Sequence, residues 1–275
     1  MARSDSKKAQ KSNVIINELS TFTLVEAFKA IRTNLNFALP HNLKCKKILF
    51  TSSFPGEGKT TVSANTALTI AQTDARVLLI DADLRKPKIH TRFGIENGVG
   101  LSNVLSGMAA LDEAIINTGK GNLSIMTSGA IPPNPAELLA SENMRELLTT
   151  LEDRFDYIII DTSPINVVAD ALDVSAMVDG VVLIVKFKSS THPAVRAAIG
   201  KLQFVGANIL GFIMNDVNVS SQKYYKKGKG YKYSKYGYGK YGRGYGYGYG
   251  YGYGYGYSHN NSDQNRNLSE DQKNR

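Results

Sequence analysis

The segment Ser53–Thr60 reads Ser-Phe-Pro-Gly-Glu-Gly-Lys-Thr, and it constrains the fold more than any other part of the chain. The apolar run Lys47–Ser52 before it predicts a buried strand, and the small-residue run Thr60–Gln72 after it predicts a helix. Glycines at such a junction let backbone N–H groups turn inward, and a helix N-terminus favours anions. The segment therefore predicts a phosphate-binding loop, although Ser53 stands where the strict pattern has glycine.

This loop predicts a site for ATP and Mg²⁺ with defined tasks for its residues. Gly56 and Gly58 allow the backbone to approach the phosphates, Lys59 holds the β- and γ-phosphates, and the Thr60 hydroxyl ligates Mg²⁺. Asn215, at the end of a later predicted strand, is expected either to contact adenine or to serve as a turn residue. The expected nucleotide-binding residues are Pro55, Gly56, Glu57, Gly58, Lys59, Thr60, Thr61 and Asn215.

Three aspartates follow two further apolar runs. Asp81 and Asp83 come after Leu78–Ile80, and Asp161 comes after Ile158–Ile160. In open α/β sheets, ligands bind at the carboxyl ends of the strands, so these carboxylates should converge on the phosphate loop. Mg²⁺ prefers hard oxygen ligands, so Thr60, Asp83 and Asp161 are expected to hold it directly or through water. A single aspartate in such a place can instead be a helix cap.

The remaining pattern predicts an α/β fold. Short apolar runs alternate with helical segments, which is typical of βαβ units with a mainly parallel sheet and helices on both faces. Helical spacing of apolar residues predicts a first helix over Phe22–Leu39, which Pro40 ends. Besides the strand before the loop, the expected strands are Val77–Ile80, Ile158–Ile160, Val181–Val185 and Ile209–Met214.

The charge of the chain is concentrated in one segment. The formal net charge is +9, but residues 222–257 contain eight Lys or Arg and no acidic residue. The rest is nearly neutral, so the globular part is not expected to bind nucleic acid. The single cysteine, Cys45, excludes an intramolecular disulfide and fits a reducing compartment. No apolar run reaches the ~20 residues of a membrane span, which indicates a cytoplasmic protein.

Tyrosine and glycine dominate the end of the chain. With no aliphatic residues to form a core, residues 221–275 are expected to be disordered. The predicted organisation is a flexible segment 1–20, a globular domain 21–220 and this tail. Fourteen of the fifteen tyrosines lie in the tail: Tyr224, Tyr225, Tyr231, Tyr233, Tyr236, Tyr238, Tyr241, Tyr245, Tyr247, Tyr249, Tyr251, Tyr253, Tyr255 and Tyr257.

The segments Ser53–Thr60 and Leu78–Arg85 together resemble the motifs of MinD/ParA-like P-loop ATPases. They are more similar to those of the bacterial tyrosine kinases, specifically the cytoplasmic kinase subunit of Gram-positive capsule and exopolysaccharide systems. The likeness covers roughly Glu18 to Val217 and the tail. Asp161–Pro164 differs from the family's Asp-Thr-Pro-Pro only at Ser163, and Phe54 stands where partition ATPases carry a lysine.

The resemblance implies a protein-tyrosine kinase that autophosphorylates its tail tyrosines in trans and regulates polysaccharide synthesis and export. Lys59, Asp81, Asp83 and Asp161 would be catalytic, with Asp81 accepting the proton of the tyrosine hydroxyl. Glu26, Lys29 and Arg32 resemble an oligomerisation motif, Glu-x-x-Arg-x-x-Arg, with Lys29 in place of the first arginine.

The resemblance also implies partners for the chain. These are a homo-oligomeric ring, a transmembrane activator whose cytoplasmic tail completes the site and brings the kinase to the inner face of the membrane, and a protein-tyrosine phosphatase.

Two rival functions fit parts of the sequence. A MinD/ParA-like positioning ATPase without kinase activity would share the loop, but the missing lysine and the clustered tyrosines count against it. A protein that binds RNA through its Tyr/Lys/Gly tail would use stacking and charge. An electron-transferring iron protein of this fold is excluded because cluster-ligating cysteines are absent.

Overall fold

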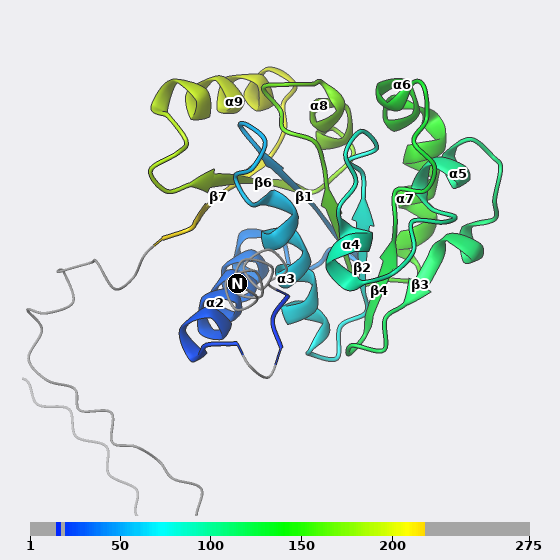
Figure 1. Ribbon diagram of the computed structural model, residues 1–275, viewed down its shortest axis with the longest axis horizontal. Coiled ribbons are helices and arrows are strands. Elements are labelled where there is room, and N and C mark those ends of the chain that lie inside the picture. Colours follow the sequence, from blue (N-terminus) through cyan, green and yellow to red (C-terminus); the bar gives the residue numbers. More distant parts are fainter. Residues whose placement is uncertain (1–14, 18–19, 218–275) are drawn as a thin grey trace, which may run out of the picture. The chain divides into compact units, whose positions relative to one another are not determined.

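A computed structural model of the chain describes residues 15–17 and 20–217 (Figure 1). The predicted tail and most of the predicted flexible N-terminal segment lie outside the described residues. Within the described part, seven strands form one sheet in the order β3-β4-β2-β5-β1-β6-β7. The strands are β1 (Lys46–Ser52), β2 (Val77–Asp81), β3 (Ile115–Asn117), β4 (Leu123–Met126), β5 (Tyr157–Asp161), β6 (Gly180–Lys186) and β7 (Ile209–Asn215).

Neighbouring strands run parallel throughout this sheet except β3, which pairs antiparallel with β4. The central strands β2 and β5 read as unbroken apolar runs before their final aspartates because both faces of the sheet are covered. Asp81 and Asp161 are register partners on these two strands, so their carboxylates emerge side by side at the same edge.

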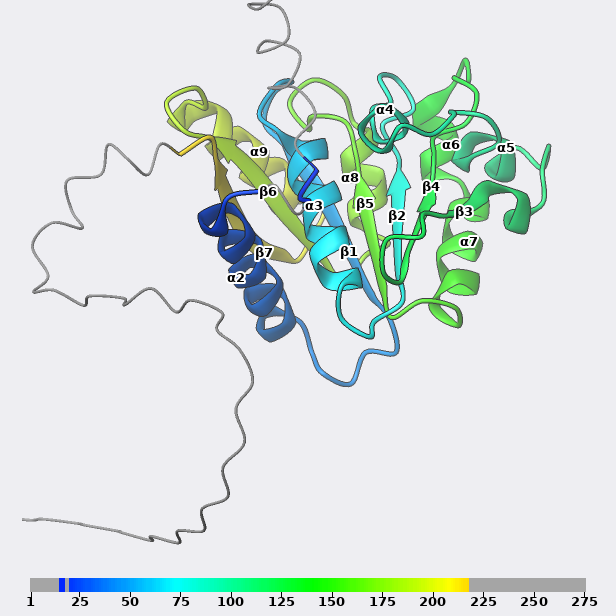
Figure 2. The same cartoon turned by 60° about the horizontal axis from the view of Figure 1, so that its bottom comes forward.

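Helices cover both faces of the sheet, and each face has its own core (Figure 2). Ile48 and Phe50 of β1 point to one face and Leu49 to the other, because side chains alternate along a strand. The first face carries α2 (Phe22–Ala38), α3 (Lys59–Ala71) and α4 (Ile89–Phe93). The second carries α5 (Leu101–Leu105), α6 (Pro135–Ala140), α7 (Glu142–Glu152), α8 (Asp170–Ser175) and α9 (His192–Phe204), with the short 3-10 helix η1 (Leu111–Ala114) before β3.

The five strands and the first two helices expected from the sequence are confirmed, with ends that differ by one or two residues. Strands β3 and β4 were not predicted. They have three and four residues, and Ser124 and Asn117 interrupt their apolar pattern. Such short runs carry too little periodicity to stand out from a loop.

Two observations bear on the expectations for the N-terminal part of the chain. Ile16 lies within the segment expected to be flexible, yet it is buried and its N–H donates to Asn65 Oδ1 at 2.7 Å. On α2, Lys29 pairs with Glu26 at 2.8 Å, whereas the Arg32 guanidinium donates to the Thr69 carbonyl of α3 at 3.1 Å. The three charges are thus engaged within the chain, and their role in oligomerisation stays a prediction.

Candidate functional site

The phosphate loop connects β1 to α3 and has the backbone that the sequence predicts. Gly56 and Gly58 have φ of +83° and +97°, a region that side chains other than glycine rarely adopt. A Cβ on Gly58 would lie 1.9 Å from Asn215 Nδ2, so a side chain at this position would displace Asn215. Helix α3 begins at Lys59 without a side-chain cap, which leaves its first N–H groups for an anionic ligand.

The side chains of Glu57 and Asn215 support this loop through hydrogen bonds. The sequence had instead suggested that both residues contact the nucleotide. The Glu57 carboxylate accepts a hydrogen bond from the Phe54 N–H at 3.0 Å and another from the Ser190 hydroxyl. Asn215 Nδ2 donates to the Glu57 carbonyl at 2.9 Å. Neither residue lines the cavity beside the loop. Glu57 and Asn215 therefore fix the shape of the loop, and the expected contact of Asn215 with adenine stays a prediction.

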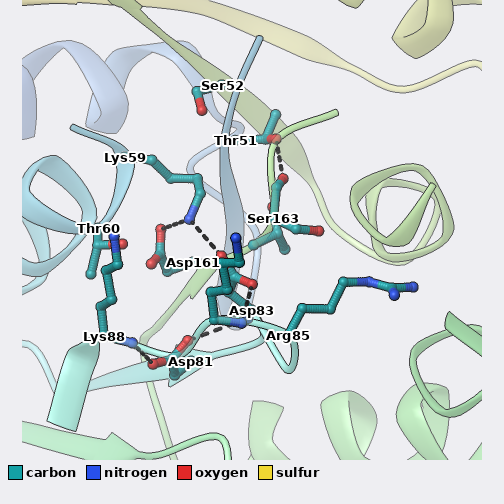
Figure 3. A network of polar contacts seen from close by, with 12 residues as sticks. Thr51, Ser52, Lys59, Thr60, Asp81, Asp83, Arg85, Lys88, Asp161 and Ser163 are labelled. Atoms are coloured by element: carbon teal, nitrogen blue, oxygen red, sulfur yellow. Dashed lines mark hydrogen bonds and ion pairs between the residues drawn. The ribbon is translucent and has the colours of Figure 1, made fainter. Parts of the chain in front are cut away.

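Lys59 joins the loop to two of the predicted aspartates (Figure 3). Its Nζ lies 3.3 Å from Asp83 Oδ2 and 3.5 Å from Asp161 Oδ1. Burial alone would lower the pKa of Lys59, but the charges of Asp161 and Asp83 raise it, so the ammonium stays charged. Burial raises the pKa of Asp161, whereas the Lys59 charge and the nearby Thr60 and Ser63 hydroxyls lower it. Within the described residues, neither Asp161 oxygen has a hydrogen bond of normal geometry.

Asp81, like Asp161, is fully buried, whereas Asp83 is 8% exposed. Asp81 Oδ2 accepts the N–H groups of Lys88 at 3.0 Å and Ile89 at 2.9 Å, whereas Oδ1 accepts only the N–H of Asp83 at 3.3 Å. Burial and the neighbouring Asp161 raise the pKa of Asp81 to about 7. A carboxyl group with that pKa can gain or lose a proton near neutral pH.

A cavity of about 460 Å³ lies in front of the loop. The lining includes most of the expected nucleotide-binding residues and, of the three aspartates, only Asp83. It consists of Ser52, Pro55, Gly56, Gly58, Lys59, Thr60, Thr61, Asp83, Arg85, Lys86, Lys88, Arg92, Ser163, Pro164, Val167, Val168 and Lys186.

Sequence reasoning missed one polar network at this site. The Arg85 guanidinium makes a bidentate pair with the Asp170 carboxylate at 2.8 and 3.0 Å, and the Ser163 hydroxyl donates to the same carboxylate at 3.2 Å. Asp170 is fully buried in the first turn of α8. Its position after Val168-Ala169 gives no signal of this contact, because Arg85 is 85 residues away in the chain.

These residues fit a nucleotide with Mg²⁺. The uncapped start of α3 and Lys59 suit phosphates, and the two Asp161 oxygens are buried acceptors without a hydrogen bond of normal geometry within the described residues. In the described part of the chain, no group of three or more His, Cys, Asp or Glu side chains is placed to hold a metal by itself. Mg²⁺ commonly takes one or two carboxylates and completes its shell with phosphates and water, so Thr60, Asp83 and Asp161 are a sufficient protein contribution.

Comparison with known proteins places the chain in a family. Residues 45–202 match the family model described as "AAA domain". The tyrosine-protein kinase YwqD of Bacillus subtilis is 42% identical over 200 residues, which cover 73% of this chain and 84% of YwqD. The chain belongs to the bacterial tyrosine-protein kinases. CapB of Staphylococcus aureus is 35% identical over 81% of this chain and 98% of CapB.

Solved structures agree with this membership. The kinase domain of the Escherichia coli tyrosine kinase Etk superposes with a TM-score of 0.68 at 38% identity, covering 78% of this chain and 80% of that domain. The septum site-determining protein MinD of Pyrococcus horikoshii, complexed with Mg-ADP, superposes with a TM-score of 0.54 at 26% identity, covering 62% and 70%. The kinase chain therefore shares its P-loop fold with MinD, and the expected fold class is confirmed.

The contact between Asn215 and the loop gives a prediction that separates two roles. Asn215→Ala should weaken ATP and GTP binding equally, about tenfold, because a loop that loses its support binds any nucleotide less well. Asn208→Ala is the matched control, since Asn208 Nδ2 donates to the Asp179 carbonyl just before the same strand, at 2.7 Å. Calorimetric titration of both nucleotides measures the effect. Weakened ATP binding with unchanged GTP binding would instead show an adenine contact.

Proposed function

We propose that this kinase binds Mg·ATP in the cavity beside the phosphate loop and phosphorylates tyrosines, beginning with those of its own tail. The observation that carries this proposal is the convergence of Lys59, Asp83 and Asp161 in front of an uncapped helix N-terminus. The Mg-ADP complex of MinD supports the same use of the shared loop. The fourteen tail tyrosines supply acceptors on the same chain.

In this proposal each polar group of the site has one task. Lys59 and the loop N–H groups hold the β- and γ-phosphates, and Thr60, Asp83 and Asp161 hold Mg²⁺. The metal neutralises charge on the phosphate oxygens. Asp81 accepts the proton of the tyrosine hydroxyl as the tyrosine oxygen bonds to the γ-phosphorus and the bond to the β-phosphate oxygen breaks, which releases ADP. Its Oδ1, with a single long hydrogen bond, is the oxygen suited to this proton.

Asp81→Asn should reduce phosphotransfer at least about 100-fold and change ATP affinity by less than about threefold, because a base acts on the acceptor. The amide keeps an oxygen for the Lys88 and Ile89 N–H groups, so the fold is expected to persist. Asp179→Asn is the control, since Asp179 accepts the Lys47 N–H at the other end of the sheet. Single-turnover rates and ATP titrations separate the two effects, and an equal loss of both would assign Asp81 to the metal site.

The family suggests where this activity operates. None of the helices in the described residues is long and apolar enough to cross a membrane. We propose that a transmembrane activator recruits the kinase to the inner face of the membrane through its cytoplasmic tail, that the subunits form a ring, and that a protein-tyrosine phosphatase reverses the reaction. The process controlled would be the synthesis and export of capsular or extracellular polysaccharide. Incubation with Mg·ATP, with and without the activator tail, followed by mass mapping of phosphotyrosine, tests this assignment.

A positioning ATPase of the MinD type is the second candidate. Phe54, which is 46% exposed on the loop, occupies the place of the lysine that such ATPases carry. That substitution, with the tyrosine tail, favours the kinase. Hydrolysis of ATP without any phosphotyrosine would favour the positioning ATPase.

A further inference from the structure

Cationic side chains dominate the charged lining of the cavity. Its lining has a single acidic residue, Asp83, and six cationic residues, which are Lys59, Arg85, Lys86, Lys88, Arg92 and Lys186. Lys59 is neutralised by Asp83 and Asp161, Arg85 is neutralised by the buried Asp170, and Lys186 lies 3.8 Å from Asp216. The cations that an entering macromolecule meets are therefore chiefly Lys86 and Lys88, at the solvent-facing edge of the cavity.

Lys86 and Lys88 are exposed residues of this edge. In Figure 3 the Lys88 side chain extends towards Thr60, whereas the Arg85 side chain runs in the opposite direction, to its partner on α8. The same cavity has an apolar wall formed by Pro164, Val167 and Val168, and Val167 is 55% exposed. An aromatic ring that packs on this wall brings its neighbouring residues close to the lysines.

The tail sequence contains two kinds of tyrosine that could be substrates at this solvent-facing edge of the cavity, here named the mouth. Residues 222–243 contain eight Lys or Arg and seven tyrosines. Residues 244–257 contain the other seven tyrosines, alternating with glycine, and no charge. A like charge facing a lysine in a partly desolvated mouth opposes binding, and specificity commonly rests on such repulsion.

We infer that the basic mouth selects acceptor tyrosines by charge, so that tyrosines with neutral or acidic neighbours react before those flanked by lysine. The seven tyrosines from Tyr245 to Tyr257 are then the first acceptors in the tail. Each phosphate adds roughly −1.5 to −2 charges. Phosphates on the neutral half thus offset the lysines of the other half, whose tyrosines become acceptable later. This inference rests on the proposed function of the site.

Three matched peptides test the selection. Each has the sequence of residues 244–257 with Gly246, Gly248, Gly252 and Gly254 replaced by glutamine, lysine or glutamate. The enzyme is the full-length chain with its fourteen tail tyrosines changed to phenylalanine, here named the tail-Phe chain. The lysine peptide should show a kcat/KM about tenfold below that of the glutamine peptide, and the glutamate peptide should at least equal the glutamine peptide. The difference should shrink at about 0.5 M salt because salt screens exposed charges.

A charge reversal at the mouth locates the effect. Lys86→Glu in the tail-Phe chain should reduce the ratio between the glutamine and lysine peptides to about twofold. Lys120→Glu is the matched control, because Lys120 is exposed and lies outside the cavity lining, and it should leave the ratio unchanged. Equal rates for the three peptides at low salt, or a ratio insensitive to Lys86→Glu, would overturn the inference.

The natural tail gives a second readout. In the wild-type chain, mass mapping at early times should find phosphate within Tyr245–Tyr257, and first phosphates on Tyr224–Tyr241 would overturn the selection. The proposed function fails separately, when neither the peptides nor the natural tail acquires phosphate while Mg·ATP binds.

Discussion

Replacing Lys59 with methionine is expected to reduce tyrosine phosphorylation at least about 1,000-fold, because the group that offsets charge on the transferred phosphoryl is removed. The fold should survive. Asp161 already has a raised pKa from burial, and without the ammonium it takes up a proton and does not remain as an unpaired buried charge. Phosphotyrosine formation and thermal unfolding of the same preparation measure the two properties.

Lys47→Met is a suitable control for this variant. Lys47 also forms a part-buried ion pair, with Glu152, but it lies at the start of β1, away from the cavity. Its loss should lower stability slightly and leave phosphorylation within about twofold of wild type. A folded Lys59→Met protein that phosphorylates tyrosine at the wild-type rate would refute the assignment of the site.

Phosphorylation of the tail is expected to occur between subunits. When a Lys59→Met chain with an intact tail is mixed with the tail-Phe chain, only the inactive chain carries tail tyrosines and only its partner carries a working site. The number of phosphate groups on each inactive chain should increase from nearly none to several. The initial rate of this increase should rise with the concentration of the active chain. Mass mapping assigns each phosphate to its chain without separating the two.

The oligomeric state supplies the companion measurement. About four or five phosphates cancel the +8 of residues 222–257 and more reverse it, so phosphorylation should shift the mixture from ring towards monomer on a sizing column. A reaction within one chain predicts the contrary. The inactive chain would then stay unlabelled, and dilution of the wild-type kinase would not change the fraction of it that is phosphorylated per unit time. Those two results would exclude the ring mechanism.

The sequence predicted which edge of the sheet carries the phosphate loop and the aspartates, because these signals are local. Glycines between a strand and a helix define the loop, and aspartates that end two apolar runs meet at one edge when the strands are parallel. The register of Asp81 with Asp161 follows from that arrangement. The pKa of each aspartate could not be predicted in this way. The pKa of Asp81, for example, depends on burial and on backbone N–H groups seven and eight residues away.

Contacts across long stretches of chain were beyond sequence reasoning. Asn215 reaches the loop across 158 residues, and its amide could as well have faced adenine. Glu57 lies within the predicted binding motif, yet its carboxylate turns towards Ser190 because a loop that presents N–H groups to phosphate directs an acidic side chain elsewhere. The spacing of a motif indicates which residues meet, but the direction of each side chain depends on packing.

The bond between Asn215 and the phosphate loop also makes a mechanical linkage. Asn215 is the last residue of β7. A displacement of the end of β7 would therefore act on the Glu57 carbonyl through the Asn215 side chain, and on β6 through the bond from the Phe187 N–H to the Asn215 carbonyl. The coupling is reciprocal: a loop stiffened around a nucleotide would hold the end of β7 more firmly, and a shift of that strand end would move the Glu57 carbonyl.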